Sequence, residues 1–146
     1  MYLLDTNTCI GVLHTKIPGL VERLQSHDPA EVCLCSMVKA ELLYGARHSE
    51  RIVDNLQLLA EFFAPYRSLP FDDLCAEHYG MIRAELASAG MPIGANDLVI
   101  AATARAHDAI LVTHNTGEFS RVPGLKVEDW QAEPPAANGR QHDDED

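Results

Sequence analysis

The chain has 146 residues, of which 47% are hydrophobic, and it carries a formal net charge of −11 at pH 7. This length and composition fit one globular domain with its own core, and no run of about 18 apolar residues could cross a membrane. The N-terminus also lacks the pattern of a signal peptide, so we expect a cytoplasmic protein. The acidic charge disfavours capture of nucleic acid by a broad basic surface.

The last 14 residues contribute strongly to this charge. Residues 133–146 hold five of the 22 acidic residues and one of the 11 basic residues, without apolar periodicity. Residues 1–132 hold 17 acidic and 10 basic residues, a net charge of −7. We therefore predict one folded domain over residues 1–132 and a disordered acidic tail over residues 133–146, either simply solvated or modulating the binding of nucleic acid or a partner.

The first half of the chain alternates between strand and helix patterns. Residues 2–5 read as a strand, and Thr6 or Asn7 is predicted to cap a short helix. A second helix follows over residues 18–27 and a second strand over residues 31–36. Ser36 is the expected N-cap of the next helix. A further helix over residues 50–66 carries one apolar face, made of Ile52, Leu56, Leu59 and Phe63.

The second half repeats the alternation. Residues 67–71 contain a proline and suit an edge strand. Residues 72–90 form a predicted helix that ends at a glycine and has an apolar stripe of Leu74, Met81, Ile82 and Leu86. An alanine-rich helix over residues 95–109 precedes the apolar strand 109–113, which we expect to be buried on both faces. Residues 126–130 close the sheet.

This alternation predicts an α/β sandwich around a mostly parallel sheet, whose site lies at the carboxyl ends of the strands. Asp5 ends the first strand, and Thr113 to Asn115 end the fourth. Glu41 lies early in the helix after the second strand, and Asp97 lies in the first turn of the helix before the fourth. Tertiary folding of this kind would bring the three acids together.

The four cysteines, in contrast, show no metal-site pattern. There is no CxxC pair and no HExxH motif, so we expect Cys9, Cys33, Cys35 and Cys75 to be buried, reduced thiols.

Four segments resemble successive motifs of the PIN-domain ribonucleases, and most of all those of the VapC toxins of bacterial toxin-antitoxin pairs. They are "LLDTN", "KAELLYGA", "PIGANDLVIAATA" and "LVTHNTGEF", in the family's order and spacing within residues 1–130. The resemblance implies a PIN-like α/β/α sandwich. It also implies a homodimeric endoribonuclease that is inhibited by a VapB-like antitoxin and cleaves RNA, with tRNA, including initiator tRNA, as the expected target.

By this resemblance, Asp5, Glu41 and Asp97 match the family's three core acidic positions, which bind Mg²⁺ or Mn²⁺ directly or through water. A fourth acid is expected after the fourth strand. This chain has Thr113-His114-Asn115 there, with Glu118 as the next acid. Glu118 is therefore either the fourth catalytic acid or an ordinary surface residue.

Several polar residues flank these acids. Thr6, Asn7, Thr113 and Asn115 could orient the acids or contact RNA phosphates, or they could serve only in turns. Leu42, Leu43 and Tyr44 are expected mostly in the core, although the family uses this helix pair as the antitoxin groove.

Each acid also has an ordinary structural explanation. Asp5 could be a helix N-cap, Glu41 a solvated helix residue, and Asp97 a partner of its helix dipole.

Two other functions stay open. One is a PIN-like module that has lost catalysis and only binds a partner. The other is a haloacid dehalogenase-type phosphatase, which is disfavoured because its DxD motif needs an acid where this chain has Asn7.

Overall fold

A five-stranded, entirely parallel sheet forms the centre of the protein in a computed structural model, which describes residues 1–131. The strand order is β3-β2-β1-β4-β5, with β3 and β5 at the edges. The predicted α/β sandwich and its edge strands are therefore confirmed. The strands are β1 (Tyr2–Leu4), β2 (Val32–Cys35), β3 (Arg67–Leu69), β4 (Ile110–Val112) and β5 (Lys126–Glu128).

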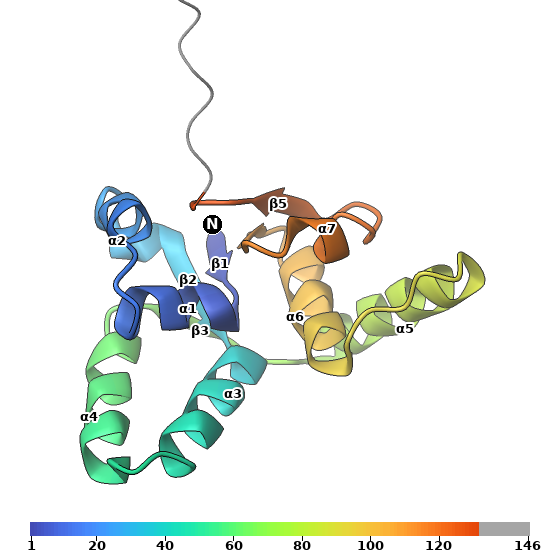
Figure 1. The fold of residues 1–146 in the computed structure, drawn as a ribbon. Helices are drawn as coiled ribbons and strands as arrows, with labels where there is room; N and C mark the ends of the chain where they lie inside the picture. Colours follow the sequence, from blue (N-terminus) through green and yellow to red (C-terminus); the bar gives the residue numbers. More distant parts are fainter. Residues whose placement is uncertain (132–146) are drawn as a thin grey trace, which may run out of the picture.

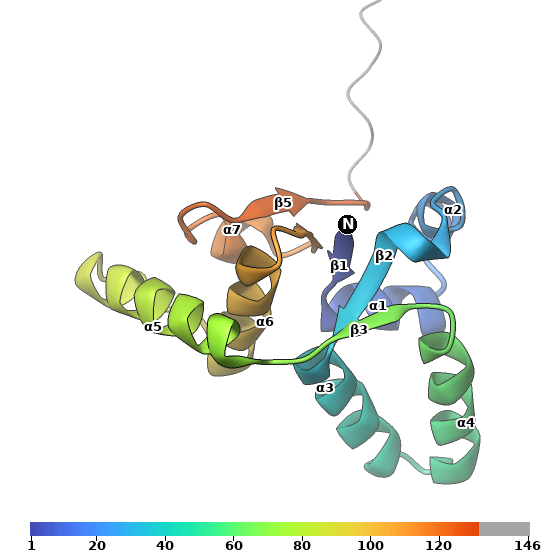
Figure 2. The same cartoon turned by 180° about the vertical axis from the view of Figure 1, so that it is seen from behind.

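Helices cover the sheet on both sides (Figure 1). Those of the first half of the chain are α1 (Thr6–Leu13), α2 (Pro18–Gln25), α3 (Ser36–Arg47) and α4 (Ile52–Phe63), with a 3₁₀ turn at Pro29–Glu31. Those of the second half are α5 (Asp73–Ser88), α6 (Ala95–Ala106) and the short α7 (Thr116–Phe119). The two groups lie on opposite sides of β1 in both views (Figures 1 and 2).

This arrangement follows from the direction in which the chain crosses the sheet. From β1 the chain proceeds to β2 and β3 on one side, and it then returns to β4 and β5 on the other. Because parallel crossovers are right-handed, reversing the direction places the later helices on the opposite face. The reversal creates a topological switch point between β1 and β4, where ligands of open α/β sheets bind.

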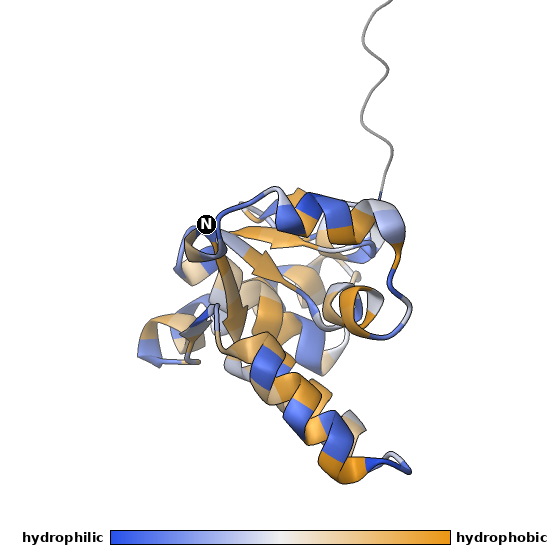
Figure 3. Ribbon diagram, turned by 90° about the vertical axis from the view of Figure 1, so that its left-hand side faces the viewer, coloured by the Kyte–Doolittle hydropathy of each residue, from blue (hydrophilic) through white to orange (hydrophobic). Residues whose placement is uncertain are grey.

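The core lies between the sheet and these helices. Leu3 and Leu4 of β1 are fully buried, as are Leu111 and Val112 of β4, because both strands have neighbours on each side and helices over each face. The strands are correspondingly hydrophobic, whereas the outer helices alternate between apolar and polar residues (Figure 3). The prediction that the fourth strand is buried on both faces is thus confirmed.

Two predicted helix caps are wrong. Asp5, and neither Thr6 nor Asn7, is the N-cap of α1, because its extended backbone lets its carboxylate accept a hydrogen bond from the Thr8 backbone N–H. Cys35 occupies the N-cap position of α3. Ser36 is already helical, and its hydroxyl group instead donates to the carbonyl oxygen of Leu69 at 3.5 Å.

Several predicted core residues are instead exposed. Of the three α3 residues expected in the core, Leu42 is buried, whereas Leu43 and Tyr44 are exposed. On α5 the buried stripe consists of Cys75, Ile82 and Leu86, while Leu74 and Met81 are exposed. On α4, Leu59 is buried but Ile52 is exposed. These helices therefore present apolar side chains on faces that no other described part of the chain covers.

The four cysteines are buried free thiols, as predicted. Among residues 1–131, no helix is long and apolar enough to cross a membrane. The predicted acidic tail, residues 133–146, lies outside the described residues.

Deleting residues 133–146 should leave the fold intact, because every described strand, helix and core residue lies before them, ending with the buried Trp130. The melting temperature of the truncated chain should match that of the full chain within about 2 °C, since no described core residue is removed. A deletion that begins at residue 129 is the matched control and should lower the melting temperature strongly, because it removes Trp130. Unfolding of the first variant would show that the domain boundary is wrong.

Candidate active site

The candidate site lies at the switch point, where the carboxyl ends of β1 and β4 meet. The two strands pair in register from Tyr2↔Ile110 to Leu4↔Val112. The carbonyl oxygen of Val112 then accepts hydrogen bonds from the Asp5 backbone N–H at 3.1 Å and from the Thr8 hydroxyl group at 3.2 Å. These two bonds fix the turn after β1 against β4 and thereby fix the position of Asp5.

Asp5 is held rigidly at the start of α1. Its side chain is only 5% exposed, and its Oδ1 atom accepts a hydrogen bond of 2.8 Å from the Thr8 backbone N–H. This bond satisfies one of the free N–H groups at the helix start. Only Oδ1 is used in the cap, so the Oδ2 atom of the same carboxylate is available for a further interaction.

Glu41 approaches the same region from the second turn of α3. Its Oε1 atom accepts a hydrogen bond of 2.8 Å from the Thr6 hydroxyl group, across 35 residues of sequence. Thr6 follows Asp5 directly, so this bond links α3 to the end of β1. The Thr6 hydroxyl group therefore holds the Glu41 carboxylate beside the residue that follows Asp5.

Asp97 lies in the first turn of α6 and is surrounded by negative charge. Its pKa is raised from 3.8 to about 6, first by burial and then by the charges of Glu118, Glu41 and Asp5. A carboxyl group whose neighbours are ionised carboxylates releases its proton less readily. The four acids therefore act electrostatically as one cluster, although they come from four separate segments.

Glu118, in α7, is held on both oxygen atoms. Oε1 accepts a hydrogen bond from the Gly94 backbone N–H at 3.0 Å, and Oε2 accepts one from the Asn115 side-chain amide at 2.7 Å. These bonds lower the pKa of Glu118 and keep it ionised. Gly94 immediately precedes α6, so the first bond ties Glu118 to the segment that carries Asp97.

Two residues of the turn after β4 support this arrangement. The Asn115 backbone N–H donates to the hydroxyl oxygen of the fully buried Thr113 at 3.0 Å, which shapes the turn that presents Asn115 to Glu118. Asn7 is exposed and makes no side-chain hydrogen bond within residues 1–131. Of the flanking polar residues predicted from sequence, Thr6, Thr113 and Asn115 thus connect to the acids, and Asn7 does not.

Sequence reasoning missed two contributors to this geometry, Thr8 and Gly94. Both donate a backbone N–H group to an acid of the site, and sequence motifs of side chains do not reveal such bonds. The only signal for Gly94 was its position directly before a predicted helix, where free N–H groups are expected. An ideal Cβ atom at Gly94 would lie 3.6 Å from Asp97 Oδ2 and 4.0 Å from Glu118 Oε1.

The cluster suits a hard divalent cation. Its donors are carboxylate oxygens, which Mg²⁺ and Mn²⁺ prefer, and their mutual repulsion is the kind that such an ion relieves. One oxygen of Asp5 and one of Glu41 accept these hydrogen bonds, and the second oxygen of each is not used in them. Without an ion, the acids of residues 1–131 do not form a group of three whose ligand atoms all lie within 4.8 Å of one another. Glu118 has both oxygens engaged and contributes mainly its charge.

Comparison with known proteins assigns the whole arrangement to one family. The PIN domain matches residues 2–125 of the chain. The chain is 41% identical to the tRNA(fMet)-specific endonuclease VapC of Shigella flexneri over 129 residues, which are 88% of this chain and 97% of that protein. It is 38% identical to ribonuclease VapC2 of Haemophilus influenzae strain Rd, with the same coverage of both chains.

Solved structures agree in fold. The DNA-bound VapBC complex of Salmonella typhimurium contains a chain that is 39% identical and matches with a TM-score of 0.84, over 88% of this chain and 97% of that one. The VapBC2 complex of Rickettsia felis, bound to a DNA fragment from its promoter, matches with a TM-score of 0.83 at 35% identity, over 88% and 98% of the two chains. The chain therefore belongs to the PIN-domain family and, within it, to the VapC ribonucleases of VapBC toxin-antitoxin systems.

Proposed function

We propose that this VapC ribonuclease cleaves tRNA, with initiator tRNA as its target, by using Mg²⁺ or Mn²⁺ held by Asp5, Glu41 and Asp97. The observation that carries the metal-dependent mechanism is the gathering of four carboxylates at the switch point, where burial and then the neighbouring acids raise the pKa of Asp97 to about 6. The nucleases of the PIN-domain family are generally metal-dependent. Relatives that are 41% and 39% identical are named tRNA(fMet)-specific endonucleases, which supports the choice of substrate.

In this proposal, Asp5, Glu41 and Asp97 hold the ion directly or through water, and Glu118 adds its charge through its fixed position. The bound ion supplies a more acidic water molecule and neutralises charge on the non-bridging phosphate oxygens. The protein residues supply the geometry. Asp5 is fixed by its cap bond, Glu41 by Thr6, and Glu118 by Gly94 and Asn115, so little rearrangement is needed when RNA binds.

Binding of RNA must overcome the acidic charge of the chain. Of the basic residues near the helices of the site, Arg105 is engaged with His78 and the Pro123 carbonyl oxygen, and the Lys39 ammonium group lies over the Phe63 ring. Arg47 is exposed at the end of α3 and suits a phosphate contact. An RNA target and buried, reduced thiols also fit the predicted cytoplasmic location.

A groove on the α3–α4 hairpin suits a VapB-like antitoxin. Its volume is about 280 Å³, and its lining is mainly apolar, with residues of α1, α3 and α4 that include Ile10, Leu42, Gly45, Ala46 and Leu59. Glu41 also lines the groove, so an apolar helix or strand bound there would end beside the acids. Solved structures of similar chains are VapBC complexes, which supports such a partner.

A second apolar surface supports the proposed homodimer. Leu74, Met81 and Met91, along and after α5, are each about half exposed, and Phe71 before the helix is 41% exposed. The helix packs on α6 with its other face. Contact between two copies of α5 would remove this apolar surface from water.

The Glu41→Gln variant and metal removal test the proposed reaction. The amide keeps the acceptor for Thr6 but removes the charge, so we expect RNA cleavage to fall by at least about a hundredfold at every Mg²⁺ concentration. EDTA should abolish cleavage by the parent chain, and added Mg²⁺ or Mn²⁺ should restore it. Cleavage is measured with purified tRNA, and targets are mapped by sequencing RNA 5′ ends after brief induction in cells.

The matched control for this experiment is Glu22→Gln, which removes an exposed acid of α2 far from the site and should leave cleavage unchanged. Undiminished cleavage in excess EDTA would refute the metal-dependent mechanism. Cuts in RNAs other than tRNA that disappear with Glu41→Gln would refute only the proposed substrate.

The raised pKa of Asp97 predicts how stability depends on pH in EDTA. The folded-state pKa of about 6 exceeds the unfolded value of 3.8, so folding favours the protonated acid. The stability contributed by this group is thus present below about pH 4 and is lost as the pH rises through about 6. Asp97→Asn should therefore melt at a higher temperature than the parent at about pH 7.5, and the difference should shrink at about pH 4.

Because Asp97 is half-buried, solvent screening will keep this effect small. Added Mg²⁺ should raise the melting temperature of the parent more than that of Asp97→Asn, since an ion stabilises only the fold that binds it. Asp73→Asn, at an exposed position of α5, is the control and should show neither effect. A melting temperature of Asp97→Asn that is lower at both pH values would assign Asp97 a purely structural role.

The groove predicts that Gly45→Leu weakens antitoxin binding without harming the fold. A Cβ atom at Gly45 would meet no atom within 4 Å, so the larger side chain projects into the groove and not into the core. We expect the melting temperature to be kept and the affinity for the cognate antitoxin to fall by at least about tenfold, as measured by calorimetry. Gly19→Leu, an equally uncrowded position on α2, is the control. Equal affinities for both variants would place the antitoxin elsewhere.

A further inference from the structure

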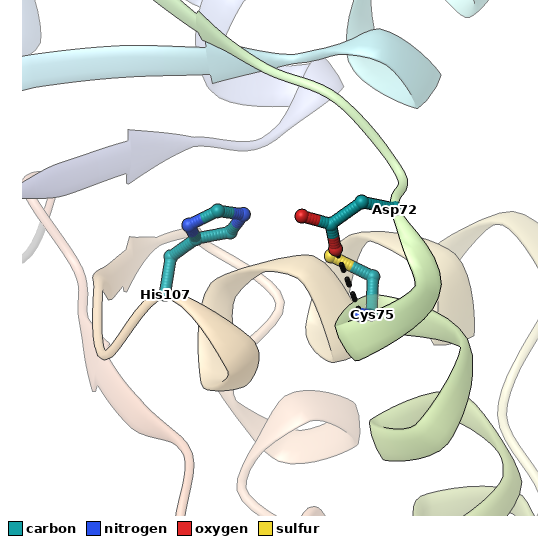
Figure 4. A group of neighbouring side chains, drawn as sticks. All are labelled: Asp72, Cys75 and His107. Atoms are coloured by element: carbon teal, nitrogen blue, oxygen red, sulfur yellow. Dashed lines mark hydrogen bonds between the residues drawn. The ribbon is translucent and has the colours of Figure 1, made fainter.

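A second group of metal-ligating side chains lies at the opposite end of α6 from the acids. Asp72 is the N-cap of α5, Cys75 lies in the first turn of that helix, and His107 is the C-cap of α6. One ligand atom from each residue lies within 4.8 Å of the other two. Figure 4 shows the His107 ring directed at the Asp72 carboxylate and the Cys75 sulfur.

One nitrogen atom of the His107 ring is buried without a hydrogen-bond partner in the described part of the chain. Within residues 1–131, its Nε2 atom is the one buried side-chain nitrogen or oxygen without a hydrogen-bond partner. Buried polar atoms nearly always have a partner, because leaving one unpaired costs free energy. A simple ion pair with Asp72 does not account for this nitrogen, since such a pair would give it a hydrogen bond.

The thiol of Cys75 lies close to the His107 ring and the Asp72 carboxylate. Cys75 is fully buried, and its Sγ atom lies 3.7 Å from the Pro70 carbonyl oxygen and next to the Asp72 carboxylate. Burial raises the pKa of this thiol, whereas a nucleophilic cysteine needs a lowered pKa. The three residues therefore do not suit a Cys-His-Asp hydrolytic triad, but a metal ion would displace the thiol proton to solvent on binding.

Asp72 completes the set and keeps one oxygen free. Its Oδ1 atom accepts a hydrogen bond of 3.0 Å from the Cys75 backbone N–H and so caps α5. The cap fixes the carboxylate next to the sulfur atom and leaves Oδ2 for a ligand (Figure 4). Sulfur, imidazole nitrogen and carboxylate oxygen together are the donor set of zinc sites, whereas Mg²⁺ takes oxygen ligands.

We propose that Asp72, Cys75 and His107 bind one Zn²⁺ ion, with water as the fourth ligand, and that the ion joins the start of α5 to the end of α6. Tetrahedral coordination at normal bond lengths places such ligand atoms about 3.3 to 3.7 Å apart. The observed limit of 4.8 Å is wider, so small side-chain rotations would close the site around the ion.

This site is independent of the acid cluster. Asp97 and His107 are ten residues apart on α6, which corresponds to about 15 Å along a helix. The donor sets also differ, since the acids provide only oxygen. A probe that detects a metal–sulfur bond therefore reports on this site alone, and its result does not depend on how RNA is cleaved.

Cobalt(II) is such a probe, because a thiolate ligand produces a near-ultraviolet charge-transfer band. We expect the reduced, metal-free full chain to develop this band with one equivalent of Co²⁺, and Zn²⁺ to displace the cobalt. Cys75→Ala should abolish the band. His107→Gln and Asp72→Asn should weaken Co²⁺ binding by at least about tenfold, and Asn still caps α5, so the fold is kept.

The matched control is Cys33→Ala, which removes a buried thiol from β2 whose hydrogen-bond acceptor is the Tyr2 carbonyl oxygen, and it should keep the band. Zn²⁺ should raise the melting temperature of the parent and the control but not of Cys75→Ala. Absence of the band in the parent chain, or an unchanged band in His107→Gln and Asp72→Asn, would overturn the proposal.

Discussion

Repulsion between carboxylates is the constraint that the fold has to overcome at its site. Asp5, Glu41, Asp97 and Glu118 come from four segments, and the free energy of bringing them together opposes folding at neutral pH. The parallel sheet makes this possible, because its buried central strands fix the switch point regardless of the charges placed there. Burial of the core therefore has to offset the repulsion between the four carboxylates, which a divalent ion would reduce.

The acids are positioned by hydrogen bonds that also stabilise local structure. Asp5 caps α1 with one oxygen atom, so the structural and the functional explanation of this residue are compatible. The hydrogen bonds of Glu118 also serve two purposes. The bonds from Gly94 and Asn115 keep Glu118 ionised, and they join α7 to the start of α6. A carboxylate anchored in this way keeps its orientation when its neighbours change charge, which is what a pre-formed site requires.

The strands were predictable from sequence because apolar runs are local signals, whereas Asp5, Glu41 and Asp97 were singled out by the resemblance of short motifs to the PIN-domain family. The exposure of Leu43, Tyr44, Leu74 and Met81 was not predictable, since helical periodicity does not distinguish a face that meets the core from one that meets a partner. Thr6 or Asn7 was preferred over Asp5 as the cap of α1 because the first strand was expected to include Asp5, whereas β1 ends at Leu4 and the helix starts at Thr6. The approach of Cys75 to His107 has no sequence signal at all, because 32 residues separate them and only the packing of α5 on α6 joins them.

Helix α6 shows which electrostatic effect dominates at the site. Its N-terminal dipole favours a negative charge on Asp97, with a typical gain of about 0.3 to 1 kcal/mol. One pKa unit corresponds to about 1.4 kcal/mol, so the dipole alone would lower the pKa of Asp97 by less than one unit. The pKa is instead raised to about 6, which means that burial and the neighbouring carboxylates outweigh the dipole. A positive ion is therefore better suited than any helix terminus to keep Asp97 ionised at neutral pH, because only a full charge close to all the acids offsets their repulsion.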